Sequence, residues 1–182
     1  MAAIALIATA VLALLVALLF AALVEMYRDV RQLRDAMGIL DRPLPVNVTD
    51  AVGMRASTYG LPRAIDAADS ALVLFLSDRC GTCRQLAHGL TRPLVSGLWL
   101  VLEVRSDAGA ADFIERYGLA DSAREGRIIV DPTTEIARRI GIDTTPVGVR
   151  IENGAIAHAT TVPSTRYLNT ILPEPVELRQ AG

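Results

Sequence analysis

Cysteine, histidine and lysine are the scarce residues of this 182-residue chain. It contains two cysteines and two histidines, and all 18 of its basic residues are arginines. Two cysteines are too few for the disulfide framework that holds together small secreted domains. The net charge of −2 leaves no excess of positive charge to meet a phosphate backbone, so we expect no nucleic-acid binding.

The same scarcity limits metal binding. A structural zinc site needs four ligands, and the only cysteines and histidines are Cys80, Cys83, His88 and His158. The two cysteines supply half of such a site, and nothing in the sequence brings the two histidines to them. We therefore expect no metal and no other cofactor. A metal site shared between two chains, or transient copper binding by a metal chaperone, stays open as an alternative.

A run of 23 residues without a charge, Ala2–Val24, makes the N-terminal part strongly apolar. As a helix the run is roughly 34 Å long, enough for a bilayer core of about 30 Å. A cleaved signal peptide would have a basic segment before a shorter apolar stretch, and this run has neither feature. We predict that residues 1–24 form a retained transmembrane anchor.

The helical pattern continues beyond the predicted anchor. Met26, Val30, Leu33 and Met37 are spaced so that they share one helical face, and Gly38 is a plausible end of the helix. We predict a juxtamembrane helix over residues 25–38. It is followed by a proline-containing linker over residues 39–50 and a globular domain over residues 51–182.

The side of the membrane is ambiguous in the sequence. Arg28, Arg31 and Arg34 follow the apolar run, and by the positive-inside rule they place the domain in the cytoplasm. The two cysteines, Cys80 and Cys83, favour the opposite side, since cysteines of exported proteins are the ones oxidised or reduced outside the cytoplasm. We expect a single-pass protein of the cell membrane with its cysteine-containing domain on the extracytoplasmic side.

The two cysteines form a CxxC motif, Cys80-Gly81-Thr82-Cys83. The motif separates an apolar run typical of a buried strand, Ala71–Leu76, from a helical pattern, Cys83–Leu90. A CxxC at a strand-to-helix junction predicts thiol–disulfide exchange, because the N–H groups of a helix N-terminus stabilise a thiolate. Arg79 adds a positive charge that favours the thiolate of Cys80. The alternative is a pair of inert core thiols.

Strands and helices alternate along the rest of the domain. Asn153-Gly154 between two alternating segments predicts a β-hairpin, and Asp131 and Ser164 are predicted to cap helices. We expect an α/β domain with a central mixed sheet and flanking helices. The predicted strands are Ala71–Leu76, Leu98–Val104, Arg127–Val130, Val147–Glu152 and Ala155–Thr160. The predicted helices are Cys83–Leu90, Gly109–Gly118, Pro132–Ile140 with Pro132 as its first residue, and Ser164–Leu172.

Three segments together resemble the thioredoxin superfamily. They are Phe75–Arg84 around the CxxC motif, Thr145-Pro146 at the start of a strand, and Glu152-Asn153-Gly154 at the hairpin. The additional strand and helix over Ile128–Ile140 look like the insertion of the membrane-anchored TlpA/ResA-like branch, which includes the MauD-like thiol–disulfide oxidoreductases. The resemblance covers roughly residues 70–172 and implies a thioredoxin-like fold.

The resemblance also implies roles for individual residues. Cys80 would be the attacking cysteine and Cys83 the resolving one, Pro146 would be a cis-proline beside them, and Thr145 would offer its backbone to an extended substrate segment. Thioredoxin carries a tryptophan where this chain has Arg79.

A second departure concerns a position on the strand before the motif, where thioredoxin carries a buried acid and this chain has Leu74. Glu103 is a weak candidate for a replacement proton acceptor, and we expect it to face solvent or to pair with an arginine. The two departures favour a dedicated partner over a general reductant.

These observations predict a membrane-tethered thiol–disulfide oxidoreductase that acts on cysteines of a specific exported client. The resemblance suggests a maturing cytochrome or an amine dehydrogenase as the client. Its partners would be the client's thiols or disulfides, a second redox protein and membrane lipid, and the direction of electron flow stays open. The alternative function is a non-catalytic thioredoxin-like subunit of a membrane complex.

Overall fold

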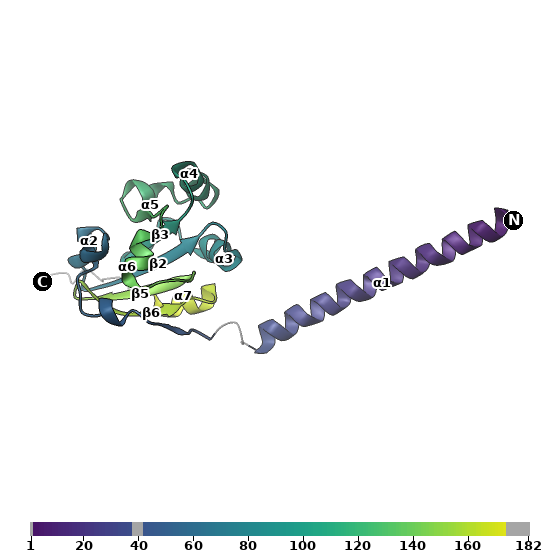
Figure 1. Cartoon of the computed structure of the whole chain (residues 1–182), viewed down its shortest axis with the longest axis horizontal. Coiled ribbons are helices and arrows are strands. Elements are labelled where there is room, and N and C mark those ends of the chain that lie inside the picture. The colour runs from purple at the N-terminus through teal and green to yellow at the C-terminus, as the bar shows by residue number, and fades with distance from the viewer. Residues whose placement is uncertain (1, 38–41, 174–182) are drawn as a thin grey trace, which may run out of the picture. The chain divides into compact units, whose positions relative to one another are not determined.

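The computed structural model describes residues 2–37 and 42–173. The chain divides into two compact units, one ending at Arg42 and the other beginning at Pro43 (Figure 1).

The first unit is a single long helix, α1 (Ala2–Met37). Its most apolar stretch is Ala10–Val30, with a mean hydropathy of 2.5 over 21 residues. In the described part of the chain this is the one helix that length and composition allow to cross a membrane, and an N-terminal signal sequence would meet the same criteria. The helix runs unbroken across the predicted boundary between residues 1–24 and 25–38, while the predicted stop at Gly38 lies outside the described residues.

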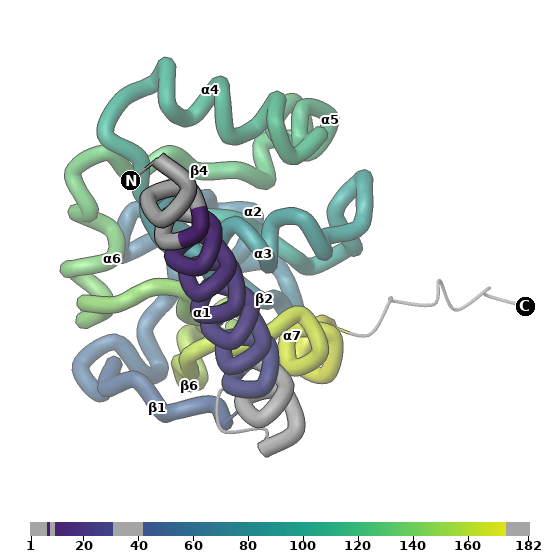
Figure 2. Tube along the Cα trace, turned by 90° about the vertical axis from the view of Figure 1, so that its right-hand side faces the viewer, coloured from purple at the N-terminus to yellow at the C-terminus, as the bar shows by residue number. Residues whose placement is uncertain are grey.

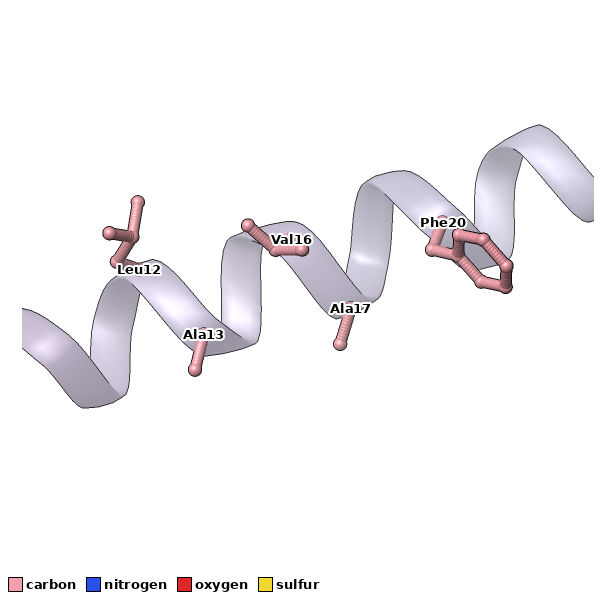
Figure 3. Close-up of a pocket in the computed structure, with 5 residues that line it drawn as sticks. All are labelled: Leu12, Ala13, Val16, Ala17 and Phe20. Carbon is pink, nitrogen blue, oxygen red and sulfur yellow. The ribbon is translucent and has the colours of Figure 1, made fainter.

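The surface of α1 is apolar around its middle (Figure 3). A shallow hollow there is lined only by side chains of this one helix, with small alanines beside larger residues. No second element encloses it, so it is a feature of an exposed helix surface and not a binding cavity. Its lining residues are Leu12, Ala13, Val16, Ala17 and Phe20.

The second unit is organised around a six-stranded mixed sheet with the strand order β1-β6-β5-β2-β3-β4 (Figure 1). Strands β2, β3 and β4 are parallel, whereas β5 is antiparallel to β2, β6 to β5 and β1 to β6. The strand bounds are β1 (Pro45–Val46), β2 (Ser70–Ser77), β3 (Leu98–Glu103), β4 (Ile128–Val130), β5 (Val147–Glu152) and β6 (Ala155–Thr161).

Helices cover both faces of this sheet. On one face α3, α4 and α7 pack over the leucines of β2 and β3, and α3 lies beside α7 (Figure 2). On the other face α2, α6 and two 3₁₀ turns pack over Val73, Phe75 and Val101. The bounds are α2 (Arg63–Asp66), α3 (Gly81–Gly89), α4 (Asp107–Arg116), α5 (Ala120–Arg124), α6 (Glu135–Ile140) and α7 (Thr165–Ile171), with 3₁₀ turns η1 (Thr49–Ala51) and η2 (Ala56–Tyr59).

The architecture is thioredoxin-like, as the sequence predicts. The β2–α3–β3 unit has parallel strands, and the β5–β6 hairpin followed by α7 completes the sheet on its other side. Side chains 71–77 of β2 are all buried, which explains why this strand reads as a continuous apolar run. Asn153 and Gly154 both have positive φ, the conformation that a two-residue hairpin of type I′ requires.

Two regions differ from the sequence-based expectation. The segment 39–50, predicted as a linker, contributes strand β1, because Pro45 and Val46 pair with Thr160 and Ala159 of β6. Two residues of backbone pairing leave too little periodicity in the sequence to reveal a strand. The helices α2, with 4 residues, and α5, with 5 residues, are also absent from the prediction, because helices this short show no clear periodicity in the sequence.

The start of α6 differs as well. The side chain of Asp131 caps this helix, as predicted, because its carboxylate accepts hydrogen bonds from the N–H groups of Glu135, Ile136 and Ala137. The helix nevertheless begins at Glu135, because a turn closed by the Thr134 N–H and the Asp131 carbonyl oxygen intervenes. Pro132 therefore lies in this turn and is not the first helical residue.

Candidate active site

The CxxC motif lies where β2 ends and α3 begins. Cys80 is the N-cap residue of α3, with extended backbone, and its Sγ accepts a hydrogen bond from the Cys83 N–H at 3.2 Å. The apolar pattern of the helix starts only at Cys83, but the CxxC motif places its first cysteine at the helix N-terminus, and α3 indeed begins at Gly81, directly after Cys80. A sulfur that caps a helix receives an N–H and lies at the positive end of the helix dipole.

The two thiols differ in exposure. Both are free cysteines, and Cys80 is partly exposed whereas Cys83 is fully buried in the first turn of α3. Burial and the hydrogen bond with Cys80 raise the pKa of Cys83 to about 12, against weaker opposing hydrogen bonds from the Ser77 backbone and the Thr145 side chain. Cys80 is therefore the more accessible of the two sulfurs, and Cys83 lies behind it as a buried, protonated thiol.

Thr145 and Pro146 lie beside the cysteines, as the family resemblance implied. The Thr145–Pro146 peptide bond is cis, and it directly precedes β5. The Cys80 Sγ–H donates to the Thr145 carbonyl oxygen across 3.6 Å. Because Phe75 of β2 pairs with Val147 of β5, the sheet itself holds this peptide next to the end of β2.

Arg79 extends into solvent next to Cys80. Its side chain is 63% exposed, and its Nε lies 3.9 Å from Oδ1 of Asp78. That oxygen is buried and has no hydrogen-bond partner among the described residues. The positive charge expected to favour the Cys80 thiolate is therefore shared with at least one carboxylate.

Glu103, which the sequence offers as a weak candidate proton acceptor, lies in the same region. It ends β3, where it pairs in register with Ser77 of β2, and Asp131 follows the neighbouring strand β4. Partial burial, followed by repulsion from the Asp131 carboxylate, raises the pKa of Glu103, while Arg79 opposes the rise. Glu103 thus faces an arginine, as expected, but it is half-buried and not fully in solvent.

Leu74 is fully buried among the leucines of the α3 face. It therefore offers no proton acceptor beneath the cysteines. The buried acid of this domain is Asp131, which is 3% exposed, and sequence reasoning treated it only as a helix cap. Its carboxylate is already occupied by the three N–H groups of α6, so it is a structural charge that acts on Glu103.

The histidines lie in separate places. His88 packs edge-on against Tyr117, with ring centroids 5.3 Å apart, and His158 lies on β6 opposite Arg150. Within the described ranges, no group of three or more histidine, cysteine, aspartate or glutamate side chains is close enough to hold a metal ion. The donor set at the motif itself is the two cysteine sulfurs.

No known protein-family profile matches the sequence, and no curated protein matches it. Solved structures that match include a secreted disulfide oxidoreductase of Mycobacterium tuberculosis, described as homologous to E. coli DsbE, at 19% identity and a TM-score of 0.41, over 54% of this chain and 73% of that one. A thiol:disulfide interchange protein from Bacteroides sp. matches at 13% identity and a TM-score of 0.44, over 59% and 74% of the two chains.

A third match is the thioredoxin domain of a thiol-disulfide oxidoreductase from Bacteroides vulgatus, at 12% identity and a TM-score of 0.42, over 59% of this chain and 82% of that one. The matching structures are thus thioredoxin-like thiol:disulfide interchange proteins. At these identities and scores the likeness carries no functional argument, so function must be argued from the residues of this chain.

Proposed function

We propose that this chain is a membrane-tethered thiol–disulfide oxidoreductase that acts on cysteines of a specific exported client through Cys80 and Cys83. The observation that carries the proposal is the hydrogen bond from the Cys83 N–H to the Cys80 Sγ, which makes a partly exposed sulfur the cap of α3. Inert core thiols would both be buried, and neither would occupy a position that stabilises its anion.

In the reducing direction, the Cys80 thiolate attacks one sulfur of a client disulfide. The client S–S bond breaks, a Cys80–client disulfide forms, and the other client sulfur leaves as a thiolate that takes up a proton. Cys83 then loses its proton and attacks the Cys80 sulfur, which releases the second client thiol. The chain ends with a Cys80–Cys83 disulfide, and two electrons have passed to the client; oxidation of a client dithiol is the reverse sequence.

The high pKa of Cys83 suits this order of events. In the reduced protein the Cys80 sulfur contributes to that pKa, both through its hydrogen bond with Cys83 and through its charge. Once Cys80 is bound in the mixed disulfide it is neutral, so these contributions disappear while the hydrogen bonds from Ser77 and Thr145 remain. Capture of the client therefore removes two of the contributions that raise the pKa of Cys83, whereas burial, the largest contribution, remains.

Thr145 and Arg79 are assigned to client recognition and thiolate stabilisation. The strand that follows Pro146 leaves the Thr145 backbone next to Cys80, where an extended client segment can pair with it. Arg79 supplies a cation beside the nucleophile, and its exposure allows it to contact an acidic group of the client. A charged residue at this position favours a dedicated client over many unrelated ones.

The apolar helix supports tethering to a membrane. The domain is assigned to the extracytoplasmic side because a tethered redox domain would serve exported proteins. The arginines that follow the apolar run favour the opposite side by the positive-inside rule. Fusion of a reporter that is active on only one side of the membrane, placed after Gly182, decides between the two orientations. Activity of an extracytoplasmic reporter is the expected result.

The test of catalysis is replacement of Cys80 by alanine in cells, with the thiol status of exported proteins measured by alkylation and mass spectrometry. At least one exported protein should change its thiol status, and the unchanged status of all of them would exclude catalysis. A redox titration of the Cys80–Cys83 pair then gives the direction. A potential near about −120 mV would indicate an oxidant, and one near about −270 mV a reductant.

A further inference from the structure

The second unit exposes large apolar side chains in one segment only. Among its described residues, the large apolar side chains that are more than a third exposed are those of Leu44 at 59%, Val52 at 50% and Met54 at 46%. Single exposed apolar residues are ordinary on a soluble surface. Here all three fall within an eleven-residue stretch of the sequence, 44–54, and we refer to them as the edge strip.

The edge strip follows the outer side of β6. At one end the Thr161 N–H donates to the Leu44 carbonyl oxygen, and at the other the Ile156 N–H donates to that of Met54. Both ends are thus anchored by backbone hydrogen bonds to the same strand. The three side chains therefore belong to one fixed edge of the sheet and are not scattered over a mobile loop.

Charges of both signs border the edge strip. Arg42 and Arg55 are exposed at either side of the segment, and Asp50 is the one acidic residue between them. Burial acts against the shift, but hydrogen bonds from Ser57, and after them the charge of Arg55, lower the pKa of the Asp66 carboxyl, so Arg55 has an acidic neighbour. An apolar strip bordered by charged groups matches the boundary between lipid headgroups and acyl chains.

Chain connectivity makes lipid the natural occupant of this edge. Leu44 follows Val30, the last residue of the apolar stretch of α1, by only fourteen residues. A tethered surface docks without losing the translational freedom of a separate molecule, so three side chains suffice where a free protein would need more. This step rests on the membrane tether of the proposed function, although not on the chemistry of the cysteines.

We propose that the edge strip, Leu44, Val52 and Met54, docks on the bilayer surface to which α1 tethers the chain. Docking fixes the sheet edge formed by β1 and β6 against the lipid and so restricts the directions from which the redox site meets a client. The site on the α3 N-terminus lies outside the strip, so docking and catalysis use different residues.

The experiment places a fluorescent probe in the edge strip. Met54→Trp is reconstituted as the full chain into vesicles of phosphatidylcholine and phosphatidylglycerol, with and without brominated acyl chains that quench tryptophan. Trp99, the one native tryptophan, is partly buried and gives the background. The matched control is Glu115→Trp, an exposed position on α4, which lies on the far side of the domain from β6 (Figure 1).

Docking predicts that the tryptophan emission of Met54→Trp falls roughly twofold in brominated vesicles, because apolar groups at the membrane interface insert about 5–10 Å into the boundary between headgroups and acyl chains. Glu115→Trp should lose no more than the wild-type chain. Adding Leu44→Ser and Val52→Ser to Met54→Trp should remove the quenching, with circular dichroism confirming that each variant keeps its fold.

The negative outcomes are distinguishable. If the chain floats with the vesicles but Met54→Trp is quenched no more than Glu115→Trp, docking is wrong and the tether stands. If the chain does not float with vesicles, the tether and the docking are both wrong, while the redox chemistry is untouched. Emission of Met54→Trp that changes with protein density but not with brominated lipid would assign the edge strip to a second copy of the chain and overturn docking.

Discussion

The Cys83 N–H donates a hydrogen bond to the Cys80 Sγ at 3.2 Å, so the motif's second cysteine stabilises the sulfur of the first through its backbone. The side chain of Cys83 meanwhile is buried, and its pKa is raised to about 12 from an unperturbed value of 9.0. One residue thus donates its backbone N–H to its neighbour's sulfur and keeps its own thiol protonated, which distinguishes the two cysteines chemically.

The first prediction concerns selective alkylation. Iodoacetamide added to the reduced protein near neutral pH should label Cys80 and leave Cys83 unmodified, because only thiolates react and Cys83 is a buried thiol. Peptide mass spectrometry counts the label at each position. Equal labelling of the two cysteines in the folded protein would contradict the exposure and pKa assigned to them.

The raised pKa of Cys83 also has a consequence for stability. Because the folded-state pKa lies above the unfolded value, the stabilising contribution is fully present below about pH 9 and is lost as the pH rises toward about 12. The reduced domain should therefore lose stability over this range more steeply than a Cys83→Ala variant does. Chemical denaturation at several pH values measures the difference.

Arg79 is predicted to accelerate the reaction of Cys80. Replacing it by glutamine removes an exposed cation beside the nucleophile, and the alkylation rate of Cys80 near neutral pH should fall about two- to fivefold, as expected for a solvent-screened charge pair. Arg116→Gln is the matched control, since Arg116 is a similarly exposed arginine that pairs with Asp112 on α4. If Arg79→Gln left the alkylation rate of Cys80 unchanged, the assignment of Arg79 as a residue that accelerates this reaction would be wrong.

Glu103 is predicted to lower stability at neutral pH. Its folded-state pKa is raised, so its favourable contribution is present below the unfolded value of 4.5 and is lost as the pH rises through the folded value. Glu103→Gln should therefore stabilise the domain at pH 7, by about 0.5 kcal/mol once solvent screening is considered. Glu115→Gln, on the exposed surface of α4, should leave stability unchanged in the same urea titration.

Asp131 is predicted to be the most important polar side chain of the α6 region. Its carboxylate receives three N–H groups at 2.9–3.2 Å and is almost fully buried. Asp131→Ala should destabilise the domain by about 2–4 kcal/mol, because the start of α6 loses its cap and buried N–H groups lose their partners. Asp131→Asn keeps one acceptor oxygen and should cost less; equal losses in urea denaturation would contradict the capping role.

The sequence predicts most of the strands and turns around the site, because each of them has a distinctive pattern within a few neighbouring residues. The buried strand β2, the CxxC motif and the Asn153-Gly154 turn each have a pattern that few other structures produce. Strand β1 and the closeness of Glu103 to Asp131 depend on pairing between segments far apart in sequence. Periodicity within one segment carries no information on such pairing, so these features emerge only from the assembled sheet.

The last prediction tests the hairpin that completes this sheet. A Cβ added at Gly154 would lie 2.1 Å from the Asp66 carbonyl oxygen, and Gly154 has φ +75°. Gly126 has nearly the same φ, +73°, but its added Cβ would meet nothing within 4 Å. Gly126→Ala should therefore lower the free energy of unfolding by only about 1 kcal/mol, the cost of placing a residue with a Cβ in the left-handed conformation. Gly154→Ala must also displace backbone and should cost at least about 3 kcal/mol.

The two alanine variants are compared by thermal or urea denaturation. Because Gly126 and Gly154 have nearly the same φ, the difference between their losses of stability reports the steric clash of the added Cβ at Gly154. A loss for Gly154→Ala no larger than that for Gly126→Ala would mean that the contact between the hairpin and residue 66 is looser than the structure places it. A large difference would instead show that close packing at the Asn153-Gly154 turn fixes the β5–β6 hairpin, and with it the position of Thr145 and Pro146 at the start of β5.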